Sequence, residues 1–554
     1  MEIRELRDRA AQVARGGQFA TCSMRWLPAV LLALAAAVTI LAVGGLFASR
    51  QSLWVDETTQ LNGIAMGPVH VLSWLLGDRT YLNGLPPDRN PPVSFVLGQL
   101  WGMAFGRQVQ ALRWMGIVAV ALAAAVLTWT LARRAGGIAA LAGVACFAAV
   151  PQIASIAAEV RPYPLMLFFA ALAWSSFVTL LCREEPRARH WFAFGTACIL
   201  ASYTHFFGIL MTGGLLFGLA ADAWLRGKRK TPVLCAAAIL LILCLGALPF
   251  ARQAAHLSAP LHPILPSGVL GRTGRLIARL FVSPSIAVGA IGTGLLFGCQ
   301  MLLVSGGLRS PSDRSVVQAI GFALLLPLVL CIATAWATPS FDALAPHYNA
   351  WMLPGIALAV AFGVRGLART RSMLTWGPVV VVAALDVLGC YRLLASDCFT
   401  HGPHNAVMRE LAGDRTRHTA IIVDKSEEWA YVYFPLRYEL GLNPPVFLAS
   451  SELAAESLYR VEPEATVSLA ELQEQQDYVL LVHAKSLHTR ELGNYLDGRP
   501  VALPSSSLLD HFERDPAWRQ VSTFRHVSFV GAQGTLFHKV ASKGDLAESL
   551  HYPR

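Results

Sequence analysis

Long apolar runs separated by short polar segments make up most of the first 395 residues of the chain. The first run, 26–48, is about 23 residues long, enough to cross a bilayer as a helix. It exceeds a typical signal-peptide core and follows a basic segment, so we expect an uncleaved first membrane helix. Further runs fall near 110–132, 137–155, 163–182, 190–205, 207–225, 232–250, 285–305, 316–337, 347–364 and 373–395.

The segment 91–106 decides the orientation of these runs. It is short and begins with Pro91-Pro92. If it lies in the outer interface, every arginine-rich loop faces the cytoplasm, as the positive-inside bias requires; if it crosses, every one is exported. We therefore predict eleven crossings, with the N-terminus in the cytoplasm. The loops concerned contain 133–134, 183–189, 226–230, 309–314 and 365–371.

After residue 395 no run is long enough to cross a membrane. Alternating apolar positions predict strands at 419–424, 477–484 and 521–532, and 468–476 has the pattern of a polar helix. The fold class is therefore a mainly α membrane protein followed by a soluble α/β domain. We predict a cytoplasmic basic N-terminus (1–25), a polytopic transmembrane domain (26–395) and an extracytoplasmic, or periplasmic, α/β domain (396–554).

Composition agrees with a membrane protein. Of 554 residues, 55% are hydrophobic and only 14% are charged, whereas a soluble protein carries about 25% charged residues. The net charge of +10 comes from arginines between apolar runs, which indicates membrane orientation rather than a nucleic-acid surface. The ten cysteines form no CxxC pair, which argues against zinc knuckles and redox motifs.

Two adjacent carboxylates, Asp56 and Glu57, follow the first predicted helix. Charged groups near the membrane boundary are costly and are usually functional. One interpretation is that Asp56 caps a helix that starts at Glu57. The other is that one carboxylate acts as a general base on an acceptor hydroxyl. The two are compatible, because a capping position fixes the side chain.

Glu159, Arg161 and Tyr163 stand at the entrance to another predicted membrane helix. They are either a local ion pair beside an interfacial tyrosine or a phosphate-binding group. In the second case the planar guanidinium of Arg161 bonds two oxygens of a lipid phosphate.

Three further positions on the same predicted side have two interpretations each. Asn90, before Pro91-Pro92, is either part of a rigid helix start or a site residue. His205 lies in a Thr-His-Phe turn and is either an interfacial histidine or a ligand. His347-Tyr348 precedes a late predicted helix. The pair either lies in the aromatic belt of the membrane or provides a phenol hydroxyl that bonds to phosphate.

In their order along the chain, these groups resemble the motifs of the integral-membrane GT-C glycosyltransferases of the protein mannosyltransferase and aminoarabinose transferase type. The resemblance covers about 50–365 and rests on the ordered set, since no single motif is specific. Many members have His or an acidic residue where this chain has Asn90, and Arg where it has His347. The matching residues are Asp56-Glu57, Asn90-Pro91-Pro92, Glu159, Arg161, Tyr163, Thr204-His205-Phe206 and His347-Tyr348.

The resemblance implies a GT-C fold and the inverting transfer of a single sugar from a polyprenyl-phosphate donor to an acceptor hydroxyl. The reaction would take place at the extracytoplasmic face of a bacterial inner (plasma) membrane. A lipid phosphate is a good leaving group, so one aspartate base suffices where an ordinary glycoside needs two carboxylates. The implied catalytic residues are Asp56 and Glu57, and the implied substrate-binding residues are Asn90, Glu159, Arg161, Tyr163, His205, His347 and Tyr348.

The implied partners are the lipid-linked donor, a glycan, lipid or protein acceptor, and membrane lipid, but no nucleic acid. No metal site is predicted; His256 and His262, six positions apart in a loop, are a weak signal. A divalent ion that shares the phosphate charge is the one cofactor left open.

Other functions fit parts of the pattern. A transporter or flippase for a lipid-linked glycan needs ionisable groups at mid-membrane, where Asp386 is the clearest case. A polysaccharide polymerase would add a whole oligosaccharide, and a non-catalytic scaffold would bind a partner through its outer domain.

Overall fold

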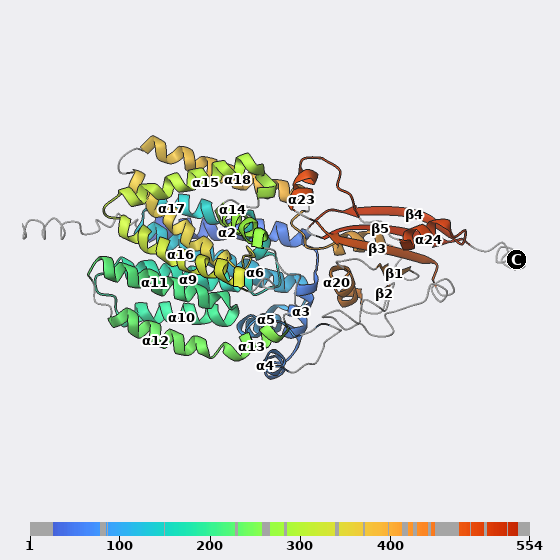
Figure 1. Cartoon of the computed structure of the whole chain (residues 1–554), viewed down its shortest axis with the longest axis horizontal. Helices are drawn as coiled ribbons and strands as arrows, with labels where there is room; N and C mark the ends of the chain where they lie inside the picture. Colours follow the sequence, from blue (N-terminus) through green and yellow to red (C-terminus); the bar gives the residue numbers. More distant parts are fainter. Residues whose placement is uncertain are drawn as a thin grey trace, which may run out of the picture. The chain divides into compact units, whose positions relative to one another are not determined.

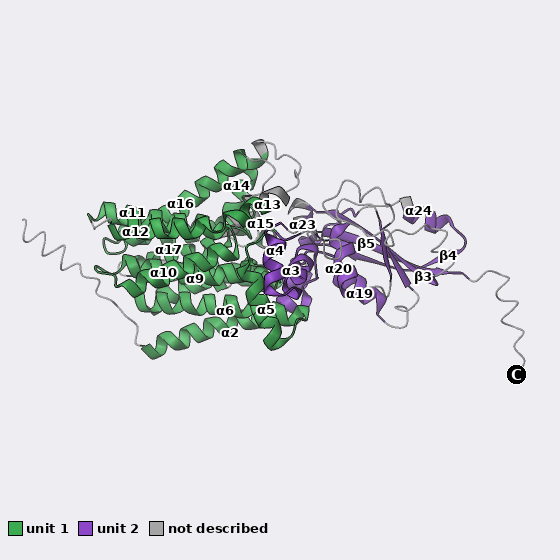
Figure 2. Cartoon of the chain, turned by 90° about the horizontal axis from the view of Figure 1, so that it is seen from below, with its two compact units in different colours: residues 1–46, 89–391 green, residues 47–88, 392–554 purple. Residues whose placement is uncertain are grey.

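The computed structural model divides the chain into two compact units (Figure 2). Unit 1 comprises 1–46 and 89–391, and unit 2 comprises 47–88 and 392–554. The predicted domain boundaries at 25 and 395 rest on composition and stay predictions. The structure describes residues 26–540 except 78–84, 86, 149, 228–230, 258–265, 282–284, 338–342, 369–371, 397, 413–418, 425–428, 441–444, 449–475, 488, 504–506 and 529.

Unit 1 consists of helices, most of which run alongside one another (Figure 1). The chain enters it through α2 and leaves it through α18, each of which extends a few residues into unit 2. The helices are α2 (Trp26–Arg50), α5 (Val93–Phe105), α6 (Val109–Arg134), α7 (Gly137–Ala148), α8 (Pro151–Ala157), α9 (Tyr163–Leu181), α10 (Ala188–Thr204), α11 (Phe207–Leu225), α12 (Thr231–Leu245), α13 (Leu248–Leu257), α14 (Pro266–Phe281), α15 (Ser285–Arg309), α16 (Arg314–Ala337), η1 (Ala350–Met352), α17 (Leu353–Ala368) and α18 (Ser372–Ser396).

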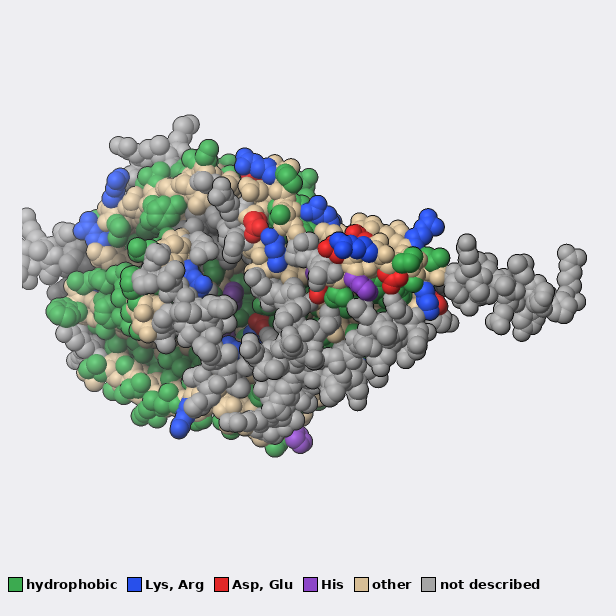
Figure 3. Space-filling view, turned by 45° about the vertical axis from the view of Figure 1, so that its right-hand side comes forward, with side chains coloured by type: hydrophobic (Ala, Val, Ile, Leu, Met, Phe, Trp, Pro, Cys, Tyr) green, Lys and Arg blue, Asp and Glu red, His purple; other side chains and the backbone are tan. Residues whose placement is uncertain are grey.

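Many of these helices can cross a membrane. Eight helices of the described residues are long and apolar enough, or up to ten if each of the bent pairs α7–α8 and α12–α13 is one span. Hydrophobic side chains cover much of the visible surface of unit 1 (Figure 3). Large apolar side chains are exposed on its helices, for example Leu241 and Ile242 of α12. The chain is a multi-span membrane protein.

The number of crossings depends on whether α10 and the segment 91–106 each cross the membrane. The one predicted run outside these ten is 190–205, which forms α10 and has 17 residues, so the count of eleven stays a prediction. The segment 91–106 contains α5, which has 13 residues. A helix of that length is about 20 Å long, too short for a hydrocarbon core of about 30 Å, as its interfacial assignment requires.

Close helix packing in unit 1 depends on small residues. Gly363 of α17 faces α15 so closely that an added Cβ would lie 2.0 Å from the carbonyl oxygen of Leu303. Gly306 of α15 faces Gly363 in return, with the carbonyl oxygen of Gly363 2.6 Å from its Cβ position. Because lipid supplies no hydrophobic drive between helices, such close backbone contact is a main source of their association.

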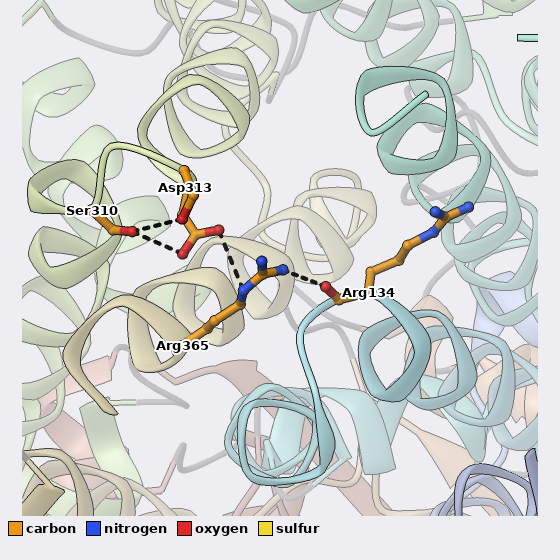
Figure 4. A network of polar contacts seen from close by, with 5 residues as sticks. Arg134, Ser310, Asp313 and Arg365 are labelled. Carbon is orange, nitrogen blue, oxygen red and sulfur yellow. Dashed lines mark hydrogen bonds and ion pairs between the residues drawn. The ribbon is translucent and has the colours of Figure 1, made fainter. Parts of the chain in front are cut away.

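This crossing brings a buried ion pair together at one end of the bundle (Figure 4). Nε of Arg365 lies 3.5 Å from Oδ1 of Asp313, and both side chains are buried. Nη1 of Arg365 donates to the backbone carbonyl of Arg134 at 2.5 Å, and Oγ of Ser310 donates to Oδ2 of Asp313 at 3.1 Å. The network therefore ties the α15–α16 connection to the ends of α17 and α6, while the Arg134 side chain points away from it.

Unit 2 is built on a five-stranded mixed sheet in the order β2-β1-β3-β5-β4. The strands β2, β1 and β3 are parallel, and β5 and β4 continue the sheet in antiparallel pairing. The edge strand β4 is bulged between Gln520 and Ser522 and exposes Arg519 and Arg525. The strands are β1 (Thr419–Val423), β2 (Val446–Leu448), β3 (Tyr478–Ser486), β4 (Trp518–His526) and β5 (Val530–Lys539).

Helices cover both faces of this sheet. One face packs its apolar side chains, such as Ile421 and Val482, against Val407 of α19 and Phe434 of α20. The other face carries Ile422 and Leu481 and contacts Phe512 of α24. The helices of unit 2 are α3 (Val55–Ala65), α4 (Pro68–Leu75), α19 (His404–Leu411), α20 (Ala430–Leu440), α23 (Thr489–Leu496) and α24 (Ser507–Arg514).

The segment 47–88 is anchored in unit 2 through aromatic and backbone contacts. Trp54 belongs to the core that lies under α20, and its ring stacks on His401 at a centroid distance of 4.2 Å. Nδ2 of Asn405 donates to the backbone carbonyl of Arg50 at 2.9 Å. Apolar periodicity could not show this, because the anchoring groups lie some 350 positions apart in the chain.

The strand predictions for the C-terminal region are partly right. The strands at 419–424 and 477–484 are confirmed as β1 and β3. The single strand at 521–532 is wrong, because the chain reverses between His526 and Val530 and pairs β4 with β5. The reversal contains no Gly, Pro or Asn to mark it, so the alternation appears continuous. The predicted helix at 468–476 lies almost wholly outside the described residues.

Because Asp313 and Arg365 are buried together, the effects of replacing them should not be additive. Arg365→Met leaves the Asp313 carboxylate buried without its cation and should lower the free energy of unfolding by about 3 kcal/mol. Asp313→Leu should act similarly, while the double variant should recover most of the loss. Unfolding in detergent, followed by circular dichroism, measures these differences; single variants as stable as the parent would contradict them.

Candidate functional site

Six side chains gather near the N-terminal end of α17, whereas Arg365 lies near the C-terminal end of that helix. The ring of Tyr163 lies 5.4 Å from that of His205 and 5.0 Å from that of His347, between centroids. The ring of Tyr348 lies 5.3 Å from those of His205 and Phe207. The guanidinium carbon of Arg161 stands 5.7 Å from the Tyr163 centroid, a cation–π distance. We call these residues the Arg161 cluster: Arg161, Tyr163, His205, Phe207, His347 and Tyr348.

Arg161 and Tyr163 are held by the close approach of α6 to the segment before α9. Tyr163 is the first residue of α9 and is fully buried. Gly116 of α6 faces the preceding backbone, where an added Cβ would lie 2.8 Å from the carbonyl oxygen of Ala157 and 3.3 Å from that of Glu159. Only glycine permits that distance, so Gly116 sets the depth at which this segment lies. Glu159 and Arg161 are both buried there.

The half-buried pair His347-Tyr348 lies in a turn that neutral hydrogen bonds fix. The buried Asn349 donates through Nδ2 to the carbonyls of Ala343 and Ala345, at 2.9 and 3.1 Å. Nε1 of Trp174, in α9, donates to the carbonyl of Trp351 at 3.0 Å. The two Asn349 bonds brace the turn internally, and the Trp174 bond fastens the residues after it to α9. The phenol and the imidazole therefore have a defined position.

His205 is neutral and has a defined tautomer. It follows the last residue of α10, where the backbone N–H of Phe207 donates to its Nδ1 at 3.3 Å. Burial, and then the nearby Arg161 charge, lower the pKa of His205 to about 3. The ring therefore carries its one proton on Nε2, since Nδ1 accepts a bond. His205 thus adds a hydrogen-bond donor to the cluster but no charge.

The remaining predicted site residues belong to other segments of the chain. Asn90 is buried in the turn just before α5. Asp56 and Glu57 belong to unit 2, in the first turn of α3. The proposed N-cap role of Asp56 is wrong, because Trp54 occupies the cap position. The helix α3 begins at Val55, two residues earlier than predicted. Trp54 and Val55 both belong to the core of unit 2, and this packing sets where the helix begins.

The two carboxylates differ in exposure. Glu57 has no exposed surface, whereas Asp56 is half-buried. Both still lie where the partial positive charge of a helix N-terminus favours an anion. The pair therefore offers one reachable carboxylate, that of Asp56.

Sequence reasoning missed three residues that shape the Arg161 cluster. Phe207 begins a predicted membrane run, Asn349 follows the more conspicuous pair His347-Tyr348, and Trp174 occurs in the middle of a predicted helix. The polar Asn349 between an aromatic pair and an apolar helix was the one available signal. Among the described residues, no group of three or more His, Cys, Asp or Glu is placed to hold a metal; His262 lies outside them.

Comparison with known proteins identifies the fold. The family model of dolichyl-phosphate-mannose-protein mannosyltransferases matches residues 89–250, a range that includes Asn90, Arg161 and His205. The structure is similar to that of ArnT from Cupriavidus metallidurans in the apo state, with a TM-score of 0.53 and 13% identity over 91% of this chain and 97% of that one. The chain has the GT-C fold.

The same ArnT bound to undecaprenyl phosphate matches with a TM-score of 0.50, 13% identity and the same coverage of both chains. No curated protein sequence matches this chain significantly. The resemblance to the protein mannosyltransferase and aminoarabinose transferase type is confirmed. At 13% identity the structural match establishes the fold alone. Any inference about chemistry depends on the residues of the Arg161 cluster.

The neutral state of His205 predicts acid sensitivity. Below pH 6.5 the unfolded chain binds a proton at this position and the folded chain does not, so stability falls as pH decreases towards 3. Between pH 7 and 4.5 this group should cost about 2–3 kcal/mol of unfolding free energy. His205→Gln should remove that part of the pH dependence, measured by denaturant unfolding at both pH values.

Phe207→Leu is the matched control for this prediction. It reduces packing in the same cluster without removing a titrating group, so it should lower stability equally at both pH values. A pH dependence unchanged by His205→Gln would show that the folded protein protonates His205 normally.

Proposed function

We propose that this protein is a membrane glycosyltransferase of the GT-C type that moves a single sugar from a polyprenyl-phosphate donor to an acceptor hydroxyl, with inversion. The observation that carries the proposal is the Arg161 cluster: one buried guanidinium surrounded by hydroxyl, imidazole and aromatic groups at one end of an apolar helix bundle. A charge in that position needs an anionic partner or internal pairing. A lipid phosphate supplies such an anion at the level of its own leaflet.

The cluster suits the departure of a lipid phosphate. As the bond between the anomeric carbon and the phosphate oxygen breaks, its electron pair goes to the phosphate. Arg161 and the hydroxyl of Tyr348 stabilise this developing charge, and Nε2–H of His205 is a third donor. The aromatic faces of Tyr163 and Phe207 exclude water, which strengthens each of these interactions.

Asp56 is the proposed base. Its carboxylate takes the proton of the acceptor hydroxyl while that oxygen forms the new bond to the anomeric carbon, from the side opposite the phosphate. Its half-buried position supports this role, while the buried Glu57 acts on the orientation of α3. The sharing of the phosphate charge by a divalent ion stays a prediction, as do the roles of Asn90 and Glu159.

The proposed location is the bacterial plasma membrane, with the N-terminus in the cytoplasm and the Arg161 cluster facing outward. The contacts of Arg365 with Arg134 and Asp313 support this orientation. They show that arginine-rich connections from different parts of the chain meet at the end of unit 1 away from the cluster, as the positive-inside bias requires. The acceptor is a hydroxyl of a glycan, lipid or protein.

A lipid-linked glycan flippase is the second candidate, supported by Asp386. This carboxylate is buried within α18, and its Oδ2 has no hydrogen-bond partner in the described part of the chain. Intramembrane acids often serve transport. Asp386→Asn should leave transfer unchanged if the protein is a glycosyltransferase, whereas donor accumulation without covalent product would favour the flippase. A polysaccharide polymerase would instead add a whole oligosaccharide, which mass spectrometry of the product distinguishes.

Asp56→Asn should reduce sugar transfer by about 10²–10⁴-fold, the usual contribution of a general base. The amide has nearly the same shape, so insertion and folding should be unchanged. Radiolabelled transfer from a polyprenyl-phosphate sugar in membranes measures the effect. Asp510→Asn, an exposed acid on α24, is the matched control and should transfer normally. Near-normal transfer by Asp56→Asn would exclude Asp56 as the base.

Arg161→Lys should lower kcat/KM for the donor by about 10–100-fold, because lysine keeps the charge but cannot bond two phosphate oxygens in one plane. Arg161→Ala should lower it further. Arg252→Lys, at an exposed position of α13, is the control. Donor kinetics unchanged in both Arg161 variants would favour the local ion pair with Glu159.

A further inference from the structure

The sheet of unit 2 has a topological switch point between β1 and β3. From β1 the chain goes to β2 on one side, and the next strand, β3, is added on the other side of β1. All three strands are parallel, so their carboxyl ends lie at the same edge. In open α/β sheets, ligands bind outside the carboxyl ends of the strands that flank such a point.

A row of polar side chains crosses the sheet at this point. Asp424 follows the last residue of β1, and its backbone N–H donates to the carbonyl of Val482 at 2.9 Å, which places it beside His483 of β3. His483 pairs with Gln533 of β5, which pairs with Arg525 of β4. Directly paired residues project from the same face. At about 4.8 Å per strand, the row is about 14 Å long.

The row runs from a buried end to an open end. His483 is 2% and Asp424 is 8% exposed, whereas Gln533 is half-buried and Arg525 is exposed. One step along the same face lies Thr535, which is 1% exposed and pairs with Leu481. Side-chain exposure in the row therefore increases from β3 towards the edge strand β4.

Hydrogen-bonding capacity remains unused at the buried end. Both ring nitrogens of His483 and the hydroxyl of Thr535 have no hydrogen-bond partner among the described residues. Buried polar groups in native proteins nearly always have a partner, and an exception calls for a bound water, ion or ligand. A strand position beside β1 would pack better with an apolar residue, so these groups reduce stability unless something bonds them.

The chemistry of the row favours an uncharged polyhydroxyl ligand. Burial lowers the pKa of His483 although Asp424 acts to raise it, so the ring is neutral, with one donor and one acceptor nitrogen. The carboxylate of Asp424 repels anions. A sugar presents adjacent hydroxyls that both donate and accept.

We propose that Asp424, His483 and Thr535 form a carbohydrate-binding site at the switch point of unit 2, which holds a sugar of the acceptor. The choice of a sugar as the ligand rests on the proposed function. The geometry of the site is independent of that function. The base at Asp56 and the cluster at Arg161 act on the reacting sugar; this site recognises another residue of the glycan, so the acceptor is a glycan rather than a lone lipid or a peptide hydroxyl.

Ligand-observed saturation-transfer NMR on the full-length protein tests the site. The detergent must have no sugar head group, and the probes are D-mannose, D-glucose, D-galactose and N-acetylglucosamine, each added separately. We expect at least one to receive saturation from the parent protein. His483→Leu and Thr535→Val should each weaken its apparent affinity by about tenfold, the effect of losing a bond to a buried group.

Conservative variants separate binding from folding. His483→Gln and Thr535→Ser keep a donor and an acceptor and should retain most of the binding, whereas Asp510→Asn should retain all of it. His483→Leu should be at least as stable to heat as the parent, because it removes an unpaired buried group. Loss of binding in a stable protein would confirm a ligand site.

Two results would overturn the proposal: no probe receives saturation from the parent protein, or His483→Leu binds the sugar as well as the parent does. Either would assign the unpaired groups to buried water. Because binding is measured without a lipid donor, sugar transfer that persists in such a case leaves the proposed function intact. Binding at this site without transfer from any donor would instead remove the proposed function.

Discussion

The cost of a bare charge in a lipid environment governs how unit 1 is built. Backbone groups are satisfied within helices, and most charged side chains lie at helix ends, where they find partners. Arg365 and Asp313 do so at one end through a contact that depends on Gly363. At the other end, Arg161 lies over an aromatic ring. Asp386, by contrast, lies buried within α18, away from both ends of that helix.

The Arg161 cluster owes its precision to uncharged anchors. Asn349, Trp174 and the backbone N–H of Phe207 fix the turn at Tyr348 and the ring of His205 through neutral hydrogen bonds. Neutral anchors hold these groups without competing for the guanidinium. The guanidinium of Arg161 thus lies among uncharged donors and aromatic rings, an arrangement suited to the charge of a leaving phosphate.

Much of the helical architecture follows from the sequence, because hydrophobic length is a local property. Each predicted run coincides with one helix or a bent pair, and the short segment before α6 is a short helix. The sequence also predicts that one site contains Arg161, Tyr163, His205 and Tyr348. That prediction depends on the order of the motifs along the chain, which resembles that of GT-C enzymes. Non-local facts were out of reach: that Trp54 enters the core of unit 2, that Gly116 sets the depth of Glu159, and that one alternating stretch folds back between His526 and Val530.

The exposed edge of the sheet in unit 2 has a consequence for solubility. Among the described strands β4 is an edge strand, and an edge is a template to which a strand of another molecule could add. Two arginines and a bulge interrupt that template, because like charges repel and the bulge twists the strand out of register. Copies concentrated in one membrane can thus lie side by side without their sheets fusing into a fibre.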